Sequence, residues 1–269
     1  MDALDLSTLG VNLDDLRAPV KAALELAAGL GFRAVEMTTV SGDLAPSSLS
    51  ASGRRHVRRL VEHHGLTLAA LAADLPGLRL HDARTVDERV ARTCQVVDLA
   101  VDLRVPVVST SVSVLTNPAN GAPMEMVLEA LRRIGEHADA RGVTFALRPT
   151  SEGGARLRRV LDDLRCSAIR VGLDPAAMVM AGINPVADFE QLAEQISLVH
   201  LRDGTAGTEI RGGHETRLGE GDVDLVGVLA LLRTVEFQGP HILRRTTSDT
   251  PAADLEQARA AVERMGQWR

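Results

Sequence analysis

The chain has 269 residues, a formal net charge of −6 and 45% hydrophobic residues. This composition can build a full apolar core, which excludes a disordered chain, and its acidic balance argues against nucleic acid as a partner. No apolar run approaches the roughly 20 residues of a membrane-spanning helix, so we expect no membrane contact. The first residues show no basic segment ahead of an apolar one, and we therefore expect no secretory signal and a cytoplasmic location.

The residue types also exclude several kinds of chemistry. Lys21 is the only lysine, and it falls within an amphipathic helix pattern, so a mechanism through a lysine imine at a strand end is not expected. The chain contains no tyrosine, which excludes a tyrosine general acid. Cys94 and Cys166 form neither a CxxC metal motif nor a disulfide framework.

Apolar runs and helical stripes alternate along the chain. The first run, at residues 3–11, precedes a helical stripe at 16–27, and the same alternation continues through the remaining sequence. We expect the other strands at residues 32–37, 66–71, 105–109, 143–147, 169–173, 197–201 and 241–243. Apolar side chains spaced by three to four residues predict the other helices at 54–64, 86–101, 124–134, 157–164, 185–196, 224–235 and 251–265.

Eight strand–helix units of about 34 residues each predict an α/β fold, a single (β/α)8 TIM barrel that spans residues 1–269 as one domain. No linker, charge block or low-complexity segment divides the sequence. A doubly wound open sheet is the alternative, but no GxGxxG motif follows the first strand.

In such a barrel the active site lies at the C-terminal ends of the strands and in the loops that follow them. The polar residues at these positions are Glu36, Asp74, Ser109, Ser111, Arg148, Asp174, His200, Asp203, Arg244 and Arg245. The longest loop, at residues 203–222, contains six glycines. We expect it to lack regular structure and to act as a lid or a binding loop, with backbone N–H groups that suit an anion.

Five short motifs occur in order at the expected strand ends. They are GFRAVE at 31–36, GVTFAL at 142–147, VGLDP at 171–175, VHLRDG at 199–204 and LGEGDVD at 218–224. On these motifs the chain resembles the xylose-isomerase-like barrels, also called the sugar phosphate isomerase and epimerase family. The resemblance extends over nearly the whole chain and implies a TIM barrel that acts on small sugars.

The resemblance also implies a divalent metal, held by glutamate after the fifth strand, aspartate after the sixth, histidine after the seventh and glutamate after the eighth. In that family the two glutamates also move a proton at a carbon next to a carbonyl. Asp174 and His200 match the aspartate and the histidine. The two glutamate positions carry Arg148 and Arg244, or Arg245 if the alignment slips by one residue.

Two arginines in place of two carboxylates make the local charge more positive, whereas a hard divalent cation needs oxygen ligands. We therefore expect a degenerate site without a metal, in which Arg148 and Arg244 supply the positive charge and Asp174 accepts a salt bridge. A purely structural pair of Asp174 with Arg148 is the alternative interpretation of this carboxylate. Arginine stays protonated, so the acid/base pair of the family is lost as well.

The first functional hypothesis is an isomerase or epimerase that needs neither a metal nor another cofactor. It would act on a small sugar, sugar acid or sugar phosphate by proton transfer next to a carbonyl. Its predicted catalytic residues are His200, Asp174 and Glu36. Its predicted substrate-binding residues are Arg148, Arg244, Arg217 and Glu220.

Two other hypotheses stay open. The second is a non-catalytic family member that binds a metabolite or a protein partner, because both family glutamates are missing. The third keeps a divalent metal (Mn, Mg, Co or Zn) on rearranged ligands, which are Asp174, His200 and Glu36 with His214 or Asp203 as a fourth. An oligomer is compatible with all three hypotheses.

Overall fold

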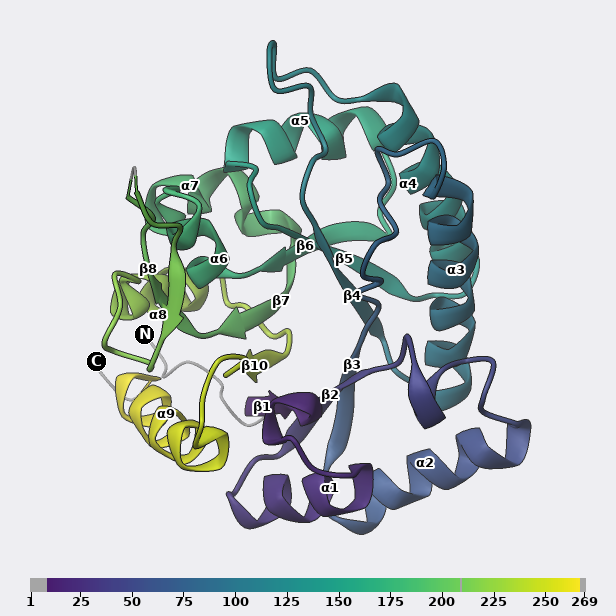
Figure 1. The fold of residues 1–269 in the computed structure, drawn as a ribbon, viewed down its shortest axis with the longest axis vertical. Helices are drawn as coiled ribbons and strands as arrows, with labels where there is room; N and C mark the ends of the chain where they lie inside the picture. Colours follow the sequence, from purple (N-terminus) through teal and green to yellow (C-terminus); the bar gives the residue numbers. More distant parts are fainter. Residues whose placement is uncertain (1–8, 209, 267–269) are drawn as a thin grey trace.

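Eight parallel strands close into a barrel at the centre of the molecule (Figure 1), which confirms the predicted (β/α)8 fold. The computed structural model describes residues 9–208 and 210–266, so most of the expected strand at 3–11 lies outside the described residues. The strands around the barrel are β1 (Leu9–Asn12), β2 (Ala34–Thr38), β3 (Thr67–Ala72), β4 (Val107–Val112), β5 (Thr144–Pro149), β6 (Ile169–Leu173), β7 (Ile196–Leu201) and β10 (His241–Leu243).

Helices surround the barrel and cover the outer side of its strands (Figure 1). They are α1 (Val20–Gly29), α2 (Ala51–His63), α3 (Val86–Leu103), α4 (Glu125–Asp139), α5 (Gly154–Leu164), α6 (Pro175–Met180), α7 (Pro185–Leu192), α8 (Leu225–Thr234) and α9 (Pro251–Gly266). Short 3-10 turns η1 (Leu13–Leu16), η2 (Gly42–Leu44) and η3 (Ala193–Gln195) complete the described elements. In this part of the chain no helix has the length and apolar character needed to cross a membrane.

Three helices differ from the sequence prediction. The helix expected at 16–27 is divided, because η1 ends at Leu16 and α1 begins at Val20, directly after Pro19. The helix expected at 185–196 ends at Leu192, because η3 and the start of β7 occupy the rest of that segment. The short helix α6 was not expected. It forms because Asp174 accepts a hydrogen bond from the backbone N–H of Ala177 as its N-cap, and Pro175 stands at the first helical position.

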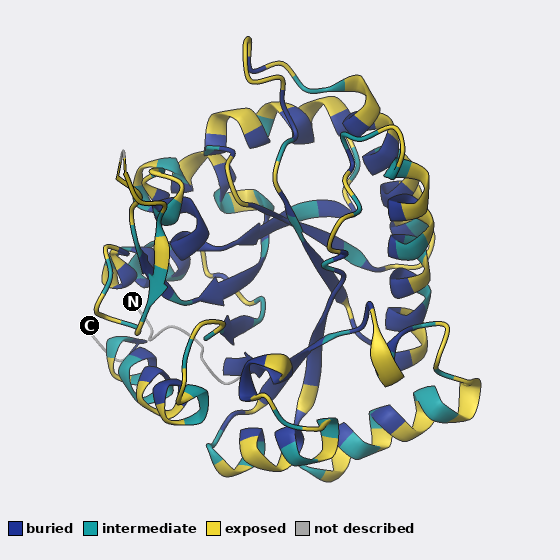
Figure 2. Ribbon diagram, viewed as in Figure 1, coloured by how far each residue is buried: buried dark blue, intermediate teal, exposed yellow. Residues whose placement is uncertain are grey.

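Side chains from alternate strand positions fill the barrel interior in layers. The strands are buried along almost their whole length (Figure 2). One inner layer is apolar and small, and it includes Ala34, Ala70, Val107, Ala146, Leu198 and Ile242. Two residues further along the chain from members of this layer stand Glu36, Ser109, Arg148, His200 and Arg244. Strand alternation therefore brings the polar strand ends together at one mouth of the barrel.

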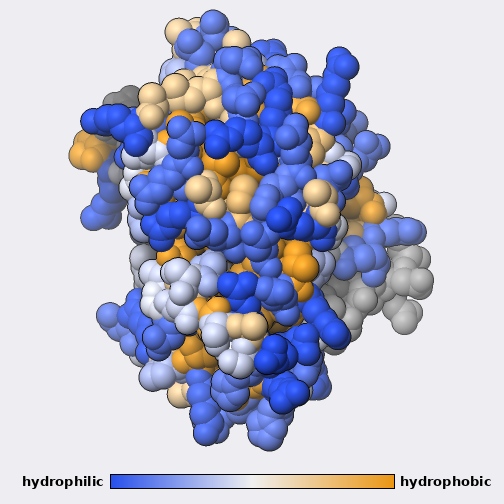
Figure 3. Space-filling model, turned by 90° about the vertical axis from the view of Figure 1, so that its right-hand side faces the viewer, coloured by the Kyte–Doolittle hydropathy of each residue, from blue (hydrophilic) through white to orange (hydrophobic). Residues whose placement is uncertain are grey.

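The outer surface, as far as the structure describes it, shows no large patch of exposed apolar side chains. The face around α3 is mostly hydrophilic, with apolar residues lying between the polar ones (Figure 3). Among the described residues, the exposed large hydrophobic side chains are distributed over several elements: Leu26, Val101, Met126, Ile210, Val226 and Val235. Single exposed apolar residues of this kind are normal for a protein surface.

The loop at 203–222 has regular structure, which corrects the sequence prediction. Its ends pair as an antiparallel hairpin of β8 (Asp203–Thr205) and β9 (His214–Thr216). The buried carboxylate of Asp203 accepts hydrogen bonds from four backbone N–H groups of its own segment at 2.8–3.2 Å. Asp203 therefore organises the loop, and its oxygens are not free to serve as a fourth metal ligand.

Asp203→Ala is expected to lower the free energy of unfolding by about 3 kcal/mol, because four backbone N–H groups lose their charged acceptor. Urea unfolding measures this loss, and hydrogen exchange should show faster opening of the hairpin. Asp249→Ala, at an exposed aspartate, is the control and should change stability by no more than about 0.5 kcal/mol. Equal losses in the two variants would contradict the organising role.

Candidate functional site

A cavity of about 210 Å³ opens at the C-terminal end of the barrel. We call it the mouth cavity. Three guanidinium groups and two carboxylates line it, from Arg148, Arg202, Arg244, Asp74 and Asp174. Hydroxyl groups come from Ser111, Thr150 and Thr246. The combination is strongly polar and places cations and anions next to one another.

Arg148 ends β5 and lies across β6 inside the barrel. Gly172 makes this path available, because a Cβ atom at Gly172 would stand 2.5 Å from Cγ of Arg148. The Arg148 Nη2 donates a hydrogen bond to Oδ2 of Asp74 at 2.5 Å. Its Nε is buried without a hydrogen-bond partner in the described part of the chain. The partner of Arg148 is therefore Asp74, and the alternative pairing with Asp174 is wrong.

Asp174 pairs with Arg202, a residue that the sequence analysis did not single out. Arg202 donates from Nε and Nη2 to the Asp174 carboxylate at 2.8–3.1 Å. Burial alone would raise the pKa of Asp174, but Arg202, His200 and the N–H of Ala177 outweigh it and lower this pKa to about 2. The sequence spacing could have identified Arg202 as a site residue. Arg202 lies two residues beyond His200, and side chains two residues apart in an extended segment point to the same side.

Glu36 on β2 is the most connected carboxylate of the site. It has no exposed surface and accepts hydrogen bonds from Asn12 Nδ2 and Ser109 Oγ, each at 2.8 Å. The His200 Nε2 lies 3.0 Å from its Oε2, and the Arg244 Nη1 lies 3.5 Å from the same atom. Burial would raise the pKa of Glu36, but His200, Arg244 and Arg148 hold it well below its usual range.

His200 on β7 stands between two carboxylates. Its Nε2 faces Glu36, while its Nδ1 lies 3.9 Å from Oδ2 of Asp174 and has no hydrogen-bond partner in the described residues. Burial lowers the pKa of His200 more than Glu36 raises it, and Arg148 and Arg244 lower it further. The imidazole is therefore neutral at pH 7 and donates its Nε2 proton to Glu36.

Arg244 follows β10 and is held from the opposite side of the mouth. Its Nε donates to Oδ2 of Asp15 in η1 at 2.7 Å. Burial would lower the pKa of Arg244, but Asp15 and Glu36 raise it strongly, so its charge is permanent. Local sequence patterns could not predict that Asp15 is the partner of Arg244, because 229 positions separate the two residues in the chain.

Arg217 and Glu220 do not lie in the mouth cavity. They line a second, larger cavity of about 690 Å³ between the β8–β9 hairpin and the segment before α9, together with His214 and Arg245. The Nε atoms of Arg217 and Arg245 both donate to Asp254 of α9, at 3.0 and 2.9 Å. The predicted binding residues thus lie in two separate cavities, with Arg148 and Arg244 in one and Arg217 and Glu220 in the other. Ion pairs with Asp254 connect the hairpin segment to α9.

The hairpin contributes one further carboxylate that the sequence analysis missed. The side chain of Glu215 is 3% exposed and lies 3.2 Å from Nη1 of Arg245 and 3.5 Å from Nη1 of Arg202. It also accepts hydrogen bonds from the backbone and the hydroxyl of Thr246. Glu215 therefore connects the hairpin to the arginine that holds Asp174.

The sequence and the fold agree with one family. The sequence model of the xylose isomerase-like TIM barrel matches residues 24–267 of the chain. The chain belongs to the xylose isomerase-like TIM barrel family. No curated protein matches the sequence.

Solved structures of xylose isomerase-like barrels superpose well on the chain. A xylose isomerase domain protein from Planctomyces limnophilus gives a TM-score of 0.84 at 19% identity over 98% of both chains. A D-tagatose 3-epimerase-like protein gives 0.76 at 17% identity, over 96% of this chain and 98% of that one. A xylose isomerase-like TIM barrel protein from Mycobacterium smegmatis, in complex with magnesium, gives 0.76 at 16% identity over 99% of both chains.

The mouth residues of this family member do not fit a divalent cation. Among the described residues, no group of three or more His, Cys, Asp or Glu side chains is arranged to hold a metal ion. Both oxygens of Asp174 accept from Arg202, and His214 lines the other cavity. Arg148 and Arg244 bring fixed positive charge to the same place, whereas a hard cation needs several oxygen ligands.

The low pKa of Asp174 predicts a loss of stability in acid. The carboxyl has a pKa of about 2 in the folded state and about 3.9 in the unfolded state, so its contribution is complete above pH 4 and disappears as the pH falls toward 2. The difference corresponds to about 2–3 kcal/mol. Urea unfolding at pH 6, 4 and 3 should show a weaker acid dependence in Asp174→Asn than in the wild type.

The exposed Asp249→Asn variant is the control for that measurement and should retain the acid dependence of the wild type. If Asp174→Asn loses stability between pH 4 and 3 as steeply as the wild type does, the ion pair with Arg202 does not stabilise the fold.

Proposed function

We propose that the chain binds a small anionic sugar derivative, a sugar acid or a sugar phosphate, in the mouth cavity without a metal ion. The observation that carries the proposal is the convergence of Arg148, Arg202 and Arg244 on a cavity of about 210 Å³. This volume is below the roughly 300–1,000 Å³ of pockets for drug-sized ligands, which favours a small metabolite. Membership of the xylose isomerase-like family supports a sugar as the ligand.

Arg148 contributes part of its guanidinium group to the wall of the mouth cavity. Its Nη2 is engaged by Asp74 and its Nε is buried, so an anion in the cavity would meet the remaining nitrogen, Nη1. Guanidinium groups bind carboxylate and phosphate with two parallel hydrogen bonds. Asp74 and Asp174 already hold Arg148 and Arg202 in place, so little side-chain entropy is lost when the ligand binds.

In this proposal the arginines also replace the charge of a metal. The family resemblance puts metal-binding glutamates where this chain has Arg148 and Arg244. A guanidinium delivers positive charge to a carbonyl or carboxylate oxygen without any need for ligands around an ion. Arg217 and Glu220 line the separate cavity, so a substrate that they contact would have to extend beyond the mouth cavity.

Arg148→Gln is expected to weaken binding of the best anionic sugar about 10- to 100-fold, because a charge-assisted hydrogen bond is lost in a buried site. The ligand is found by thermal shift with sugar acids and sugar phosphates, and its Kd is measured by titration calorimetry with chelator present. Arg211→Gln, at an exposed arginine of the hairpin, is the control and should bind like the wild type. An equal effect of the two substitutions, or binding that requires an added metal, would overturn the proposal.

A second candidate function is the isomerase or epimerase reaction. It is favoured by Asp74, whose side chain lines the mouth cavity and is 35% exposed. Burial would raise the pKa of Asp74, but Arg148 and the N–H of Ser111 lower it, so the carboxylate is ionised. It would take a proton from the carbon next to a carbonyl while a guanidinium stabilises the enolate oxygen, and return that proton to the neighbouring carbon on the same face while a hydroxyl proton passes between the two oxygens. Inversion at a single carbon would need a second proton donor on the opposite face.

Glu36, His200 and Asp174, which the sequence predicts to move the proton, have other roles in this candidate reaction. Glu36 and His200 have no exposed surface and do not line the mouth cavity. In our proposal they hold Arg244 and Asp174 in position, and Asp174 orients Arg202. Asp74 alone would exchange protons with the substrate.

Proton transfer has an isotopic signature. In deuterated water with chelator, the reaction incorporates deuterium at the carbon next to the carbonyl of a bound sugar, and NMR or mass spectrometry detects it. Asp74→Asn is expected to reduce incorporation at least about 100-fold, since a general base contributes 10²–10⁴-fold to such a step. Asp82→Asn, in the loop that follows Asp74, is the control. A ligand that binds tightly without exchange would identify a non-catalytic binding protein instead.

A further inference from the structure

Arg89 of α3 is a buried cation without a counter-ion in the described part of the chain. It is 4% exposed, and none of the described carboxylates lies within ion-pair distance of it. Its Nη1 donates to the carbonyl oxygens of Leu75 at 3.1 Å and Leu78 at 3.4 Å, and its Nη2 donates to the hydroxyl of Thr110. All of these acceptors are neutral.

These neutral acceptors take three hydrogen bonds from a group that has five N–H donors, and they leave its charge uncompensated. An uncompensated buried charge is costly. Burial lowers the pKa of Arg89 to about 10, while Asp74 acts to raise this pKa and Arg148 and Arg92 act to lower it. Asp74 itself is engaged by Arg148 and by the backbone N–H of Ser111. The protein thus holds a protonated guanidinium beside a site where an anion would be favourable.

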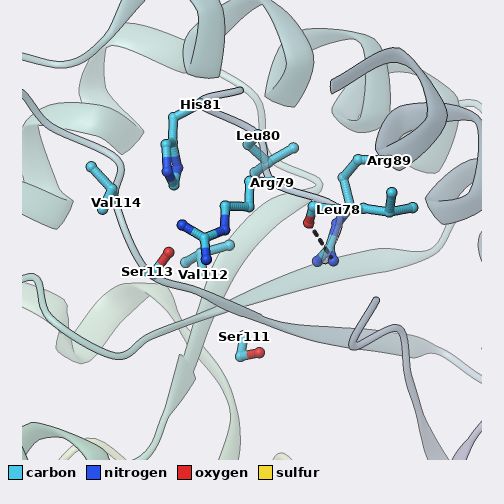
Figure 4. A pocket seen from close by; sticks show the side chains of 9 residues that line it. All are labelled: Leu78, Arg79, Leu80, His81, Arg89, Ser111, Val112, Ser113 and Val114. Carbon is cyan, nitrogen blue, oxygen red and sulfur yellow. Dashed lines mark hydrogen bonds between the residues drawn. The ribbon is translucent and has the colours of Figure 1, made fainter. Parts of the chain in front are cut away.

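A small cavity of about 40 Å³ lies beside Arg89 (Figure 4). In Figure 4 the side chains of Arg79 and His81 extend from the β3–α3 loop toward Ser113, while the Arg89 guanidinium lies next to the carbonyl oxygen of Leu78. The lining residues bring several hydrogen-bond donors and no carboxylate. We call this cavity the Arg89 pocket.

The Arg89 pocket lies next to the mouth cavity on the same face of the barrel. It is built from the loops that follow β3 and β4, and Ser111 lines both cavities. Loops at the C-terminal ends of the strands are where a TIM barrel binds its ligands. The two cavities therefore adjoin at Ser111.

We propose that the Arg89 pocket binds a terminal oxyanion, a phosphate or carboxylate group, of the ligand whose sugar part occupies the mouth cavity. Arg89, Arg79 and the hydroxyl of Ser113 are the groups that would bind it. The pocket is too small for a sugar ring, which restricts it to a compact head group. This inference rests on the proposed function for the position of the sugar, but the oxyanion site itself can be tested alone.

The test is titration calorimetry of the full chain with inorganic phosphate and, separately, with acetate, which distinguishes the two kinds of oxyanion. We expect saturable binding of at least one of them at millimolar concentration. Arg79→Gln should weaken it about tenfold, because one charge-assisted hydrogen bond is lost. Arg84→Gln is the matched control, since this exposed arginine of the same loop pairs with Asp82 and does not line the pocket. It should change the Kd less than about twofold.

Arg89→Lys serves as a second variant, because it keeps the charge but loses the planar set of donors. Arg89→Lys should also weaken binding about tenfold. A melting temperature and a circular dichroism spectrum equal to those of the wild type would show that this variant is folded. The proposed oxyanion site would be contradicted if the wild type bound neither anion. It would also be contradicted if Arg79→Gln and Arg89→Lys left binding unchanged.

Arg148→Gln separates this inference from the proposed function. If Arg148→Gln removes anion binding while Arg79→Gln leaves it unchanged, the anion occupies the mouth cavity only, and the Arg89 pocket is wrong. If Arg79→Gln weakens binding and Arg148→Gln leaves the binding of inorganic anions and of anionic sugars unchanged, the pocket stands and the mouth proposal fails.

Discussion

Buried charge has to be neutralised, and at the mouth of this barrel that requirement determines which side chains face one another. Arg148 pairs with Asp74, Arg202 with Asp174, and Arg244 with Asp15. Removing one partner of such a pair leaves the other as an unpaired buried charge, which lowers the free energy of unfolding by several kcal/mol. The mouth is therefore a set of mutually dependent pairs, and its geometry is rigid before any ligand arrives.

Glu36 connects these pairs to the barrel itself. Its hydrogen-bonding and ionic partners come from β1, β4 and β7 and from the segment after β10, so one carboxylate links strands from around the barrel. A carboxylate used in this way is well suited to hold positive charge in place and poorly suited to exchange protons with a substrate. Glu36 is fully buried, whereas the Asp74 side chain is 35% exposed and lines the mouth cavity.

Sequence alone predicted the barrel, because eight apolar runs with helical stripes between them admit few other folds. It also predicted that Arg148, Asp174, His200 and Arg244 would meet, since all of them lie at the C-terminal ends of strands. It could not predict the partners. The pairing of Arg244 with Asp15 joins distant segments of the chain, and the choice of Asp74 over Asp174 for Arg148 depends on which way a long side chain crosses the barrel.

The errors have a similar origin. The segment at 203–222 looked unstructured because its order comes from a single buried carboxylate, Asp203, which collects four backbone N–H groups. No local pattern in the amino-acid sequence reports such a contact. Arg217 and Glu220 belong to the same segment and line the second cavity instead of the mouth cavity. Their role in substrate binding stays a prediction.

Gly172 has a consequence for how this chain can diverge. The aliphatic part of Arg148 occupies the space that a side chain at Gly172 would fill, and the head of Arg148 neutralises Asp74. A larger residue at 172 is compatible with a shorter one at 148, and a shorter one at 148 leaves the carboxylate at 74 without a cation. The three positions are therefore expected to covary among related chains, so that exchanging any one of them alone lowers stability until a second exchange compensates.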